Sequence, residues 1–129
     1  MTKTTFNTED YDAVISVLQL YIDGCKQGKS VIMRPAFHPG ASFFGFVGNE
    51  LASGTEFLFD WIDRNGPAEG IQPSIASVDI LHSLAVGHLE VTGWSGKLAG
   101  ANGHMSDVFT LIKTPSGWKI IQKAFHWHS

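Results

Sequence analysis

Residues 103–128 read GHMSDVFTLIKTPSGWKIIQKAFHWH, and this stretch decides the fold. Two runs rich in β-branched and aromatic residues lie on either side of the sequence TPSG at 114–117. Such runs are typical of strands, and the Pro and Gly between them are typical of a tight turn. The stretch therefore predicts an antiparallel hairpin in which Lys113 pairs with Trp118 across the turn.

The two faces of this hairpin are expected to differ in function. Side chains alternate along a strand, so in this register Asp107 lies on an otherwise apolar face, with Gln122 and His126 as diagonal neighbours. A lone carboxylate there is costly unless it is neutral, paired or beside a cavity, so we expect a cavity on this face. The opposite face carries aromatic side chains among lysines, and we expect it to be a subunit interface. Its residues include Phe125, Trp127, Ile121 and Val108.

The rest of the chain predicts helices first and strands afterwards. Apolar residues recur at helical spacing from Tyr11 to Cys25, and Gly28 marks the end of this helix. A short second helix is expected from Ser30, and a third over 55–65. Helices followed by an antiparallel meander are typical of the α+β class. The expected strands are 41–47, 74–83, 85–94, 103–114 and 118–128.

The composition excludes several classes of protein. The chain has 129 residues, which predicts a single domain over 1–129. Its net charge is −3 and it has no basic run, so nucleic acid is not expected as a partner. Cys25 has no second cysteine to pair with, and no apolar window is long enough to cross a membrane. Because a secretory leader is also not recognisable, we expect a cytoplasmic protein.

The chain combines an N-terminal amphipathic helix with the stretch RPAFHPGA at 34–41 and with the sequences DVFTLIK at 107–113 and GWKII at 117–121. In these segments it resembles the NTF2-like superfamily and, within it, the lumazine-binding branch close to the SnoaL-like polyketide cyclases. The resemblance extends over nearly the whole chain. It implies an α+β cone, in which a curved antiparallel sheet wraps around about three helices from the N-terminal half and encloses a pocket. It also implies a homodimer through the outer face of the sheet.

A resemblance to the ketosteroid isomerases of this superfamily implies roles for individual residues. Tyr21 falls on their oxyanion-hole tyrosine, and Asp107 falls on their protonated aspartate. Their general-base aspartate falls on Gly45, which has no side chain that could accept a proton. The resemblance therefore implies carbonyl chemistry but disfavours steroid isomerisation by that mechanism.

These inferences lead to one set of candidate residues. As an enzyme, the protein would transfer a proton next to the carbonyl group of a small apolar or aromatic compound, as an isomerase, cyclase or dehydratase. The catalytic candidates are Tyr21, Asp107 and His126. The candidates for substrate binding are Met33, Phe37, Trp61, Trp94, Phe109, Gln122 and His128.

Two other functions remain open from the sequence. The protein could be a non-catalytic carrier or sensor of a lumazine-like heterocycle, or a structural dimerisation module. His126 and His128 lie two residues apart on one expected face and could share a metal ion, but two ligands do not make a zinc site. We therefore expect neither a metal nor an organic cofactor.

Overall fold

The computed structural model describes residues 8–94 and 103–128. Helical and extended segments follow one another in the order expected of an α+β protein. The helical elements are α1 (Thr8–Gln27), α2 (Ser30–Met33), a 3-10 helix η1 (Arg34–Ala36) and α3 (Thr55–Asn65). The strands are β1 (Phe37–Val47), β2 (Glu50–Ser53), β3 (Gln72–Leu81), β4 (Leu84–Thr92), β5 (His104–Thr114) and β6 (Gly117–His128).

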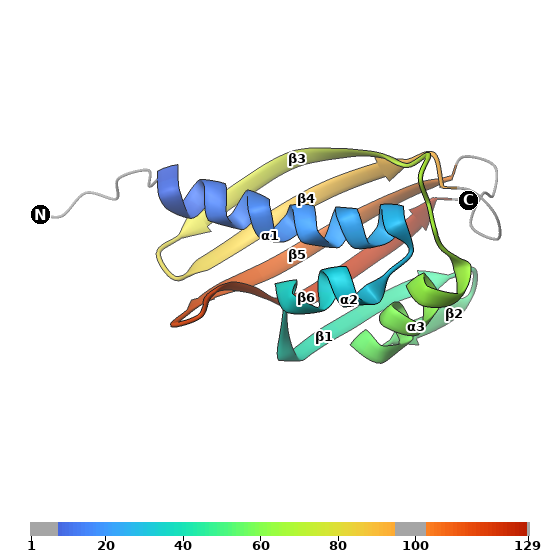
Figure 1. The fold of residues 1–129 in the computed structure, drawn as a ribbon, viewed down its shortest axis with the longest axis horizontal. Coiled ribbons are helices and arrows are strands. Elements are labelled where there is room, and N and C mark those ends of the chain that lie inside the picture. The colour runs from blue at the N-terminus through green and yellow to red at the C-terminus, as the bar shows by residue number, and fades with distance from the viewer. Residues whose placement is uncertain (1–7, 95–102, 129) are drawn as a thin grey trace, which may run out of the picture.

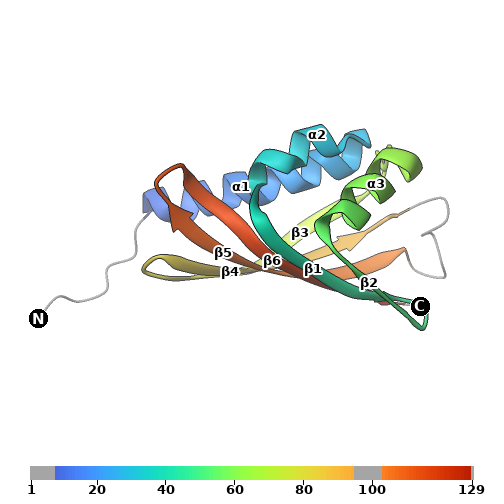
Figure 2. The ribbon, with the colours of Figure 1, turned by 90° about the horizontal axis from the view of Figure 1, so that it is seen from below.

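The strands form one curved, open sheet in the order β2-β1-β6-β5-β4-β3 (Figure 1). All three helices lie on the same face of this sheet (Figure 2). Neighbouring strands are antiparallel with one exception, because β1 runs parallel to β6. The short edge strand β2, which no sequence pattern indicated, pairs with β1. The predicted cone of a curved sheet around three helices is thus confirmed, with one parallel pair inside it.

Helix α1 covers the inner face of the sheet because one of its sides is apolar. Val14, Leu18, Tyr21 and Cys25 are all buried along that side. Their spacing of three to four residues puts them on one face of a helix, as the periodicity predicts. The opposite wall of the core comes from the inward side chains of the sheet. In the described part of the chain, no helix is long and apolar enough to span a membrane.

The β5–β6 hairpin contains a bulge that the sequence pattern did not reveal. The pairing of Lys113 with Trp118 is confirmed, and Leu111 still pairs with Ile120. The next pair, however, is Thr110 with Gln122, so one residue of β6, Ile121, is left out of the register. A bulge of this kind inserts one residue into one strand only. Everything in β6 beyond Ile121 is therefore shifted by one position relative to β5.

This shift corrects the predicted faces of the hairpin. Asp107 now pairs with Phe125 and Met105 with Trp127, so both aromatic residues turn toward the helices. The prediction that Phe125 and Trp127 belong to an outer subunit interface is wrong. Of the interface candidates, Val108 does lie on the outer face and is exposed, whereas Ile121 is the half-buried bulge residue. The bulge exchanges the faces because side chains alternate with a period of two.

Candidate functional site

A narrow apolar cavity lies between α1, α3 and the inner face of the sheet. It contains about 470 Å³ of empty space, part of which is open to solvent. Ligand sites in proteins are typically mostly apolar clefts with a few polar groups, and this cavity has that character. It is lined by Tyr21, Phe43, Val47, Phe57, Leu58, Trp61, Ile62, Trp94, Met105, Lys123, Phe125 and Trp127.

A buried ion pair stands at the inner wall of this cavity. Lys123 of β6 and Asp107 of β5 are 1% and 0% exposed, and Lys123 Nζ lies 3.2 Å from Asp107 Oδ1. Lys123 lines the cavity, whereas Asp107 is not among the lining residues and lies behind it. The second carboxylate oxygen, Oδ2, has no hydrogen-bond partner among the described residues. The lysine is therefore the charged group that a ligand would meet, and the aspartate is its counter-ion.

Aromatic rings surround the ammonium group of Lys123. Its Nζ lies 4.8 Å from the ring centroid of Phe125, 5.0 Å from Phe43, 5.1 Å from Tyr21 and 5.8 Å from Phe109. Rings at these distances attract a cation through their quadrupoles. The rings exclude water and also help to hold the charge, so the positive group is fixed in an apolar wall.

Burial changes the acidity of the groups near the ion pair. Desolvation raises the pKa of Asp107, while the positive charge of Lys123 acts in the opposite direction. Desolvation, followed by the charge of Asp107, raises the pKa of Tyr21 well above its ordinary value. The pKa of Cys25 rises to about 12, chiefly through burial. Tyr21 and Cys25 are therefore neutral at physiological pH, and Tyr21 can act only as a hydrogen-bond donor or acceptor.

The predicted site residues fall into three groups. Tyr21, Trp61 and Trp94 line the cavity. Asp107, Met33, Phe37 and Phe109 are buried in the core and do not line the cavity. The third group lies on the outer face of the sheet, on the far side from Asp107, and comprises Gln122, His126 and His128. The expectation that these last three line the cavity with Asp107 is wrong, because the bulge at residue 121 turns them outward.

Lys123 was missed as a site residue for the same reason. In a hairpin without the bulge, Lys123 lies on the outer face. A lysine there is expected to pack its methylene groups against the aromatic side chains and to keep its ammonium group in water. In the structure it pairs with Phe109 across the hairpin and with Phe43 across β1 and β6. No local sequence signal distinguishes the two positions.

The position that the resemblance assigns to a general base is filled by an aromatic ring. Gly45 pairs with Phe125 across β1 and β6, and a Cβ atom on Gly45 would lie 2.1 Å from Phe125 Cε1. The Phe125 ring also stacks on Phe43, with 5.2 Å between their centroids. A carboxylate at position 45 would therefore need this ring to move, which strengthens the case against the ketosteroid isomerase mechanism.

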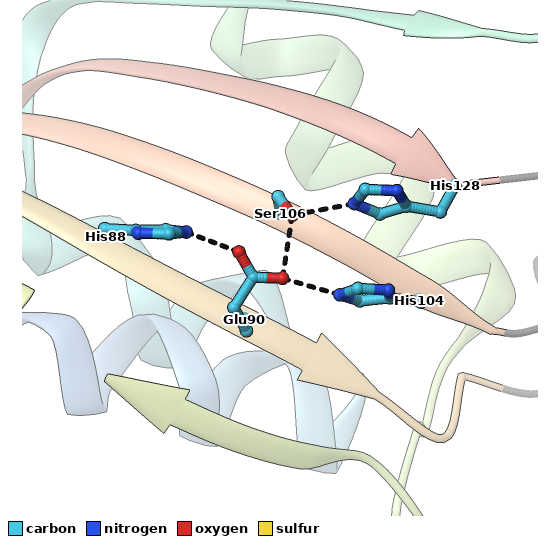
Figure 3. Close-up of polar contacts among 5 residues, drawn as sticks. All are labelled: His88, Glu90, His104, Ser106 and His128. Atoms are coloured by element: carbon cyan, nitrogen blue, oxygen red, sulfur yellow. Dashed lines mark hydrogen bonds and ion pairs between the residues drawn. The ribbon is translucent and has the colours of Figure 1, made fainter. Parts of the chain in front are cut away.

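A second polar cluster lies on the outer face, where β4, β5 and β6 run side by side (Figure 3). Glu90 contacts His88 through Oε2, and its Oε1 lies 2.5 Å from His104 Nε2 and 2.7 Å from Ser106 Oγ. Ser106 Oγ also lies 2.8 Å from His128 Nε2. Partial burial acts to raise the pKa of Glu90, but the hydrogen bonds from Ser106, His104 and His88 outweigh it and lower the pKa to about 2.

This cluster is expected to make stability depend on pH in the acid range. The pKa of Glu90 is lower in the folded protein than its ordinary value of 4.5. The ionised side chain therefore makes its full contribution to the free energy of unfolding above pH 4.5. The contribution is lost as the pH falls from about 4.5 to about 2. Because the side chain is 30% exposed, we expect a loss of about 1–2 kcal/mol, less than the full shift would imply. Urea unfolding of the wild type and of Glu90→Gln across this range should give two curves that converge at low pH. Parallel curves would contradict the assignment.

Comparisons with known proteins agree with this architecture. Residues 9–126 match the family described as "Putative lumazine-binding". The chain belongs to this family. Its fold is NTF2-like, as two solved structures of NTF2-like proteins of unknown function show. The one from Methylobacillus flagellatus KT is 32% identical, covers 100% of both chains and has a TM-score of 0.88. The one from Shewanella baltica OS155 is 33% identical, covers 98% of this chain and 99% of the other, and has a TM-score of 0.85.

The comparisons also include a protein named for an activity. Aldolase FrzH from Cladobotryum sp is 25% identical to this chain over 120 residues, which is 92% of each protein. The predicted membership of the NTF2-like superfamily and its lumazine-binding branch is thus confirmed, while the specific function of this member is not assigned by the family.

Proposed function

We propose that this protein binds a small, largely apolar carbonyl compound in its cavity and catalyses aldol-type chemistry on it, making or breaking a carbon–carbon bond next to the carbonyl group. The observation that carries the proposal is the buried Lys123–Asp107 pair, whose lysine end faces an otherwise apolar, aromatic cavity. The similarity to Aldolase FrzH over 92% of both chains supports the choice of reaction.

In the proposed reaction, the polar groups of the cavity wall stabilise an enolate. As the carbon–carbon bond of a β-hydroxy carbonyl compound breaks, the β-hydroxyl loses its proton to water in the solvent-open part of the cavity and becomes the aldehyde oxygen. The electron pair of the broken bond moves toward the carbonyl, so negative charge develops on the oxygen of the enolate, which then takes a proton from water at carbon. Lys123 donates one hydrogen bond to Asp107 Oδ1 and retains further N–H groups that can donate to this oxygen, and the Tyr21 hydroxyl is a second donor from the same wall. Such donors are most effective in a water-excluded site. Asp107 would hold the ammonium in place as a positioning residue, and the role expected for His126 is not proposed again.

The test is cleavage of an aromatic β-hydroxyketone that releases a fluorescent aldehyde. We expect measurable turnover by the wild type and a loss of at least about 100-fold in Asp107→Leu/Lys123→Met, which removes both charges together and so leaves no unpaired charge. The matched control is Lys29→Met, which removes an exposed lysine between α1 and α2 and should keep full activity. Unchanged turnover in the double variant would refute the role of the pair. A covalent adduct trapped by borohydride would show that Lys123 acts as a nucleophile instead.

A second candidate, non-catalytic binding of a planar heterocycle, is favoured by the family description and by the aromatic lining of the cavity. In that case the wild type should bind an aromatic heterocycle without turnover. The charge-free double variant should keep most of the affinity, because stacking and burial would supply it. Turnover that is lost in the double variant separates the enzyme from the carrier.

We also propose a homodimer through the outer face of the sheet, in which Val108 is kept from the residues first expected and Leu84 and Val86 are added. Leu84, Val86 and Val108 are 43%, 40% and 46% exposed on strands β4 and β5. Exposed apolar side chains gathered on one face are typical of an interaction surface. The mass of the particle in solution, measured by light scattering, tests this proposal. A cytoplasmic location stays a prediction of the sequence.

A further inference from the structure

The outer-face cluster brings together side chains that are far apart in the sequence. Glu90, His104 and His128 come from three adjacent strands, β4, β5 and β6. One ligand atom from each of the three lies within 4.8 Å of the other two. Glu90 pairs with Ser74 on one side and Ser106 on the other, and His104 pairs with His128, so all three residues belong to paired strands. The three groups are therefore held close together by the fold rather than by a flexible loop.

The geometry of the two imidazoles suits a shared ligand. His104 and His128 pair across β5 and β6, and their rings stack with 4.0 Å between centroids and 16° between planes. The polar contacts in Figure 3 show a nitrogen of His104 facing Glu90 and a nitrogen of His128 facing Ser106, which itself contacts Glu90. Two parallel imidazoles and a carboxylate thus converge on one region, with the hydroxyl of Ser106 between them.

We propose that Glu90, His104 and His128 bind one divalent transition-metal ion, for which Zn²⁺ is the natural probe. Two imidazole nitrogens and one carboxylate oxygen form a donor set that Zn²⁺ accepts, with bonds of about 2.0–2.2 Å. Bringing the three atoms around an ion needs small rotations of side chains, because they already lie within 4.8 Å of one another. The ion would take the place of the hydrogen bonds through Ser106.

The surroundings of the three ligands support the same conclusion. His88 contacts the other oxygen of Glu90, so it would orient the carboxylate as outer-shell partners of metal ligands do. In the single chain Glu90 and His104 are 30% and 32% exposed, so an ion can reach the cluster from solvent. With three protein ligands, a fourth position would remain for water or for a further group, the arrangement found in catalytic rather than structural zinc sites.

The competing explanation is a hydrogen-bonded network that serves stability alone. The experiment uses untagged protein from which a chelator has removed all metal. Zn²⁺ is titrated into this protein, and isothermal calorimetry measures the affinity and the number of ions bound. We expect one ion per chain and at least a 100-fold loss of affinity in Glu90→Gln and in His104→Asn. His88→Asn should lose about 10-fold, because it acts through Glu90. His82→Asn is the matched control, since it removes an exposed histidine from a position with φ of 57° that asparagine tolerates.

A second measurement distinguishes the loss of the metal site from misfolding of a variant. Co²⁺ bound at a site with two imidazoles and one carboxylate absorbs in the visible range, and we expect this spectrum in the wild type and in His82→Asn. It should be absent in His128→Asn while the circular dichroism of that variant stays unchanged. Zn²⁺ binding that is unsaturable, or equally strong in Glu90→Gln and in the wild type, would overturn the proposal. This site lies on the opposite face from the cavity, so its failure would leave the proposed aldol chemistry untouched.

Discussion

Replacing Lys123 with Met, or Asp107 with Leu, is expected to lower the free energy of unfolding by about 3–5 kcal/mol in each single variant. Both side chains are almost completely inaccessible to solvent, so each single change leaves one charge buried without its partner. The charge that remains cannot be hydrated, because the aromatic rings around Lys123 exclude water from this wall. Guanidinium unfolding at neutral pH measures the effect.

The double variant, Asp107→Leu/Lys123→Met, is expected to regain most of that stability. It replaces a buried ion pair with apolar side chains of similar size, a change that is often neutral or stabilising. We expect the sum of the two single losses to exceed the loss in the double variant by several kcal/mol, as a double-mutant cycle measures. A double variant as unstable as either single one would mean that the pair is not the coupled unit described here. Stability kept while turnover is lost would show that the pair is retained for chemistry.

Gly45→Ala is expected to lower the free energy of unfolding by about 3 kcal/mol, the upper end of the range for overpacking a core. The added Cβ atom would lie 2.1 Å from Phe125 Cε1 and also 2.2 and 2.5 Å from two further ring atoms. The ring cannot move aside freely, because it stacks on Phe43 within the cavity wall. Gly45 is therefore required because it has no side chain and so leaves room for the Phe125 ring, and not because of its backbone conformation.

The steric origin of this effect can be tested directly. In a Phe125→Leu background, Gly45→Ala should cost less than about 1 kcal/mol, because the colliding ring is gone. Gly70→Ala is the matched control, since its Cβ would meet only Gly93 O at 3.8 Å, an ordinary contact. An equal cost of Gly45→Ala in both backgrounds would assign the effect to the backbone of β1 instead. Phe125→Leu should also widen the cavity and allow larger carbonyl compounds to be processed.

Much of the fold could be predicted because local patterns agree with it. The apolar stripe from Tyr11 to Cys25 forms the buried side of α1, and the TPSG sequence at 114–117 forms the predicted turn. Strand β2 was missed because its four residues are too few for an alternating pattern to be recognised. Tyr21, Trp61 and Trp94 line the cavity, and their roles in binding or catalysis stay predictions.

The sequence by itself determined the class of fold, the family, the first helix, the hairpin turn and the burial of Asp107. Only the tertiary structure decided which charged partner Asp107 has and which histidines come together. One bulge residue, Ile121, reverses the two faces of β6, so that Lys123 enters the cavity while His126 and His128 leave it. Side chains alternate with a period of two, and whether a strand accommodates an extra residue depends on how the curved sheet packs against its helices. Likewise, Glu90, His104 and His128 are separated by many residues, and strand pairing alone makes them neighbours.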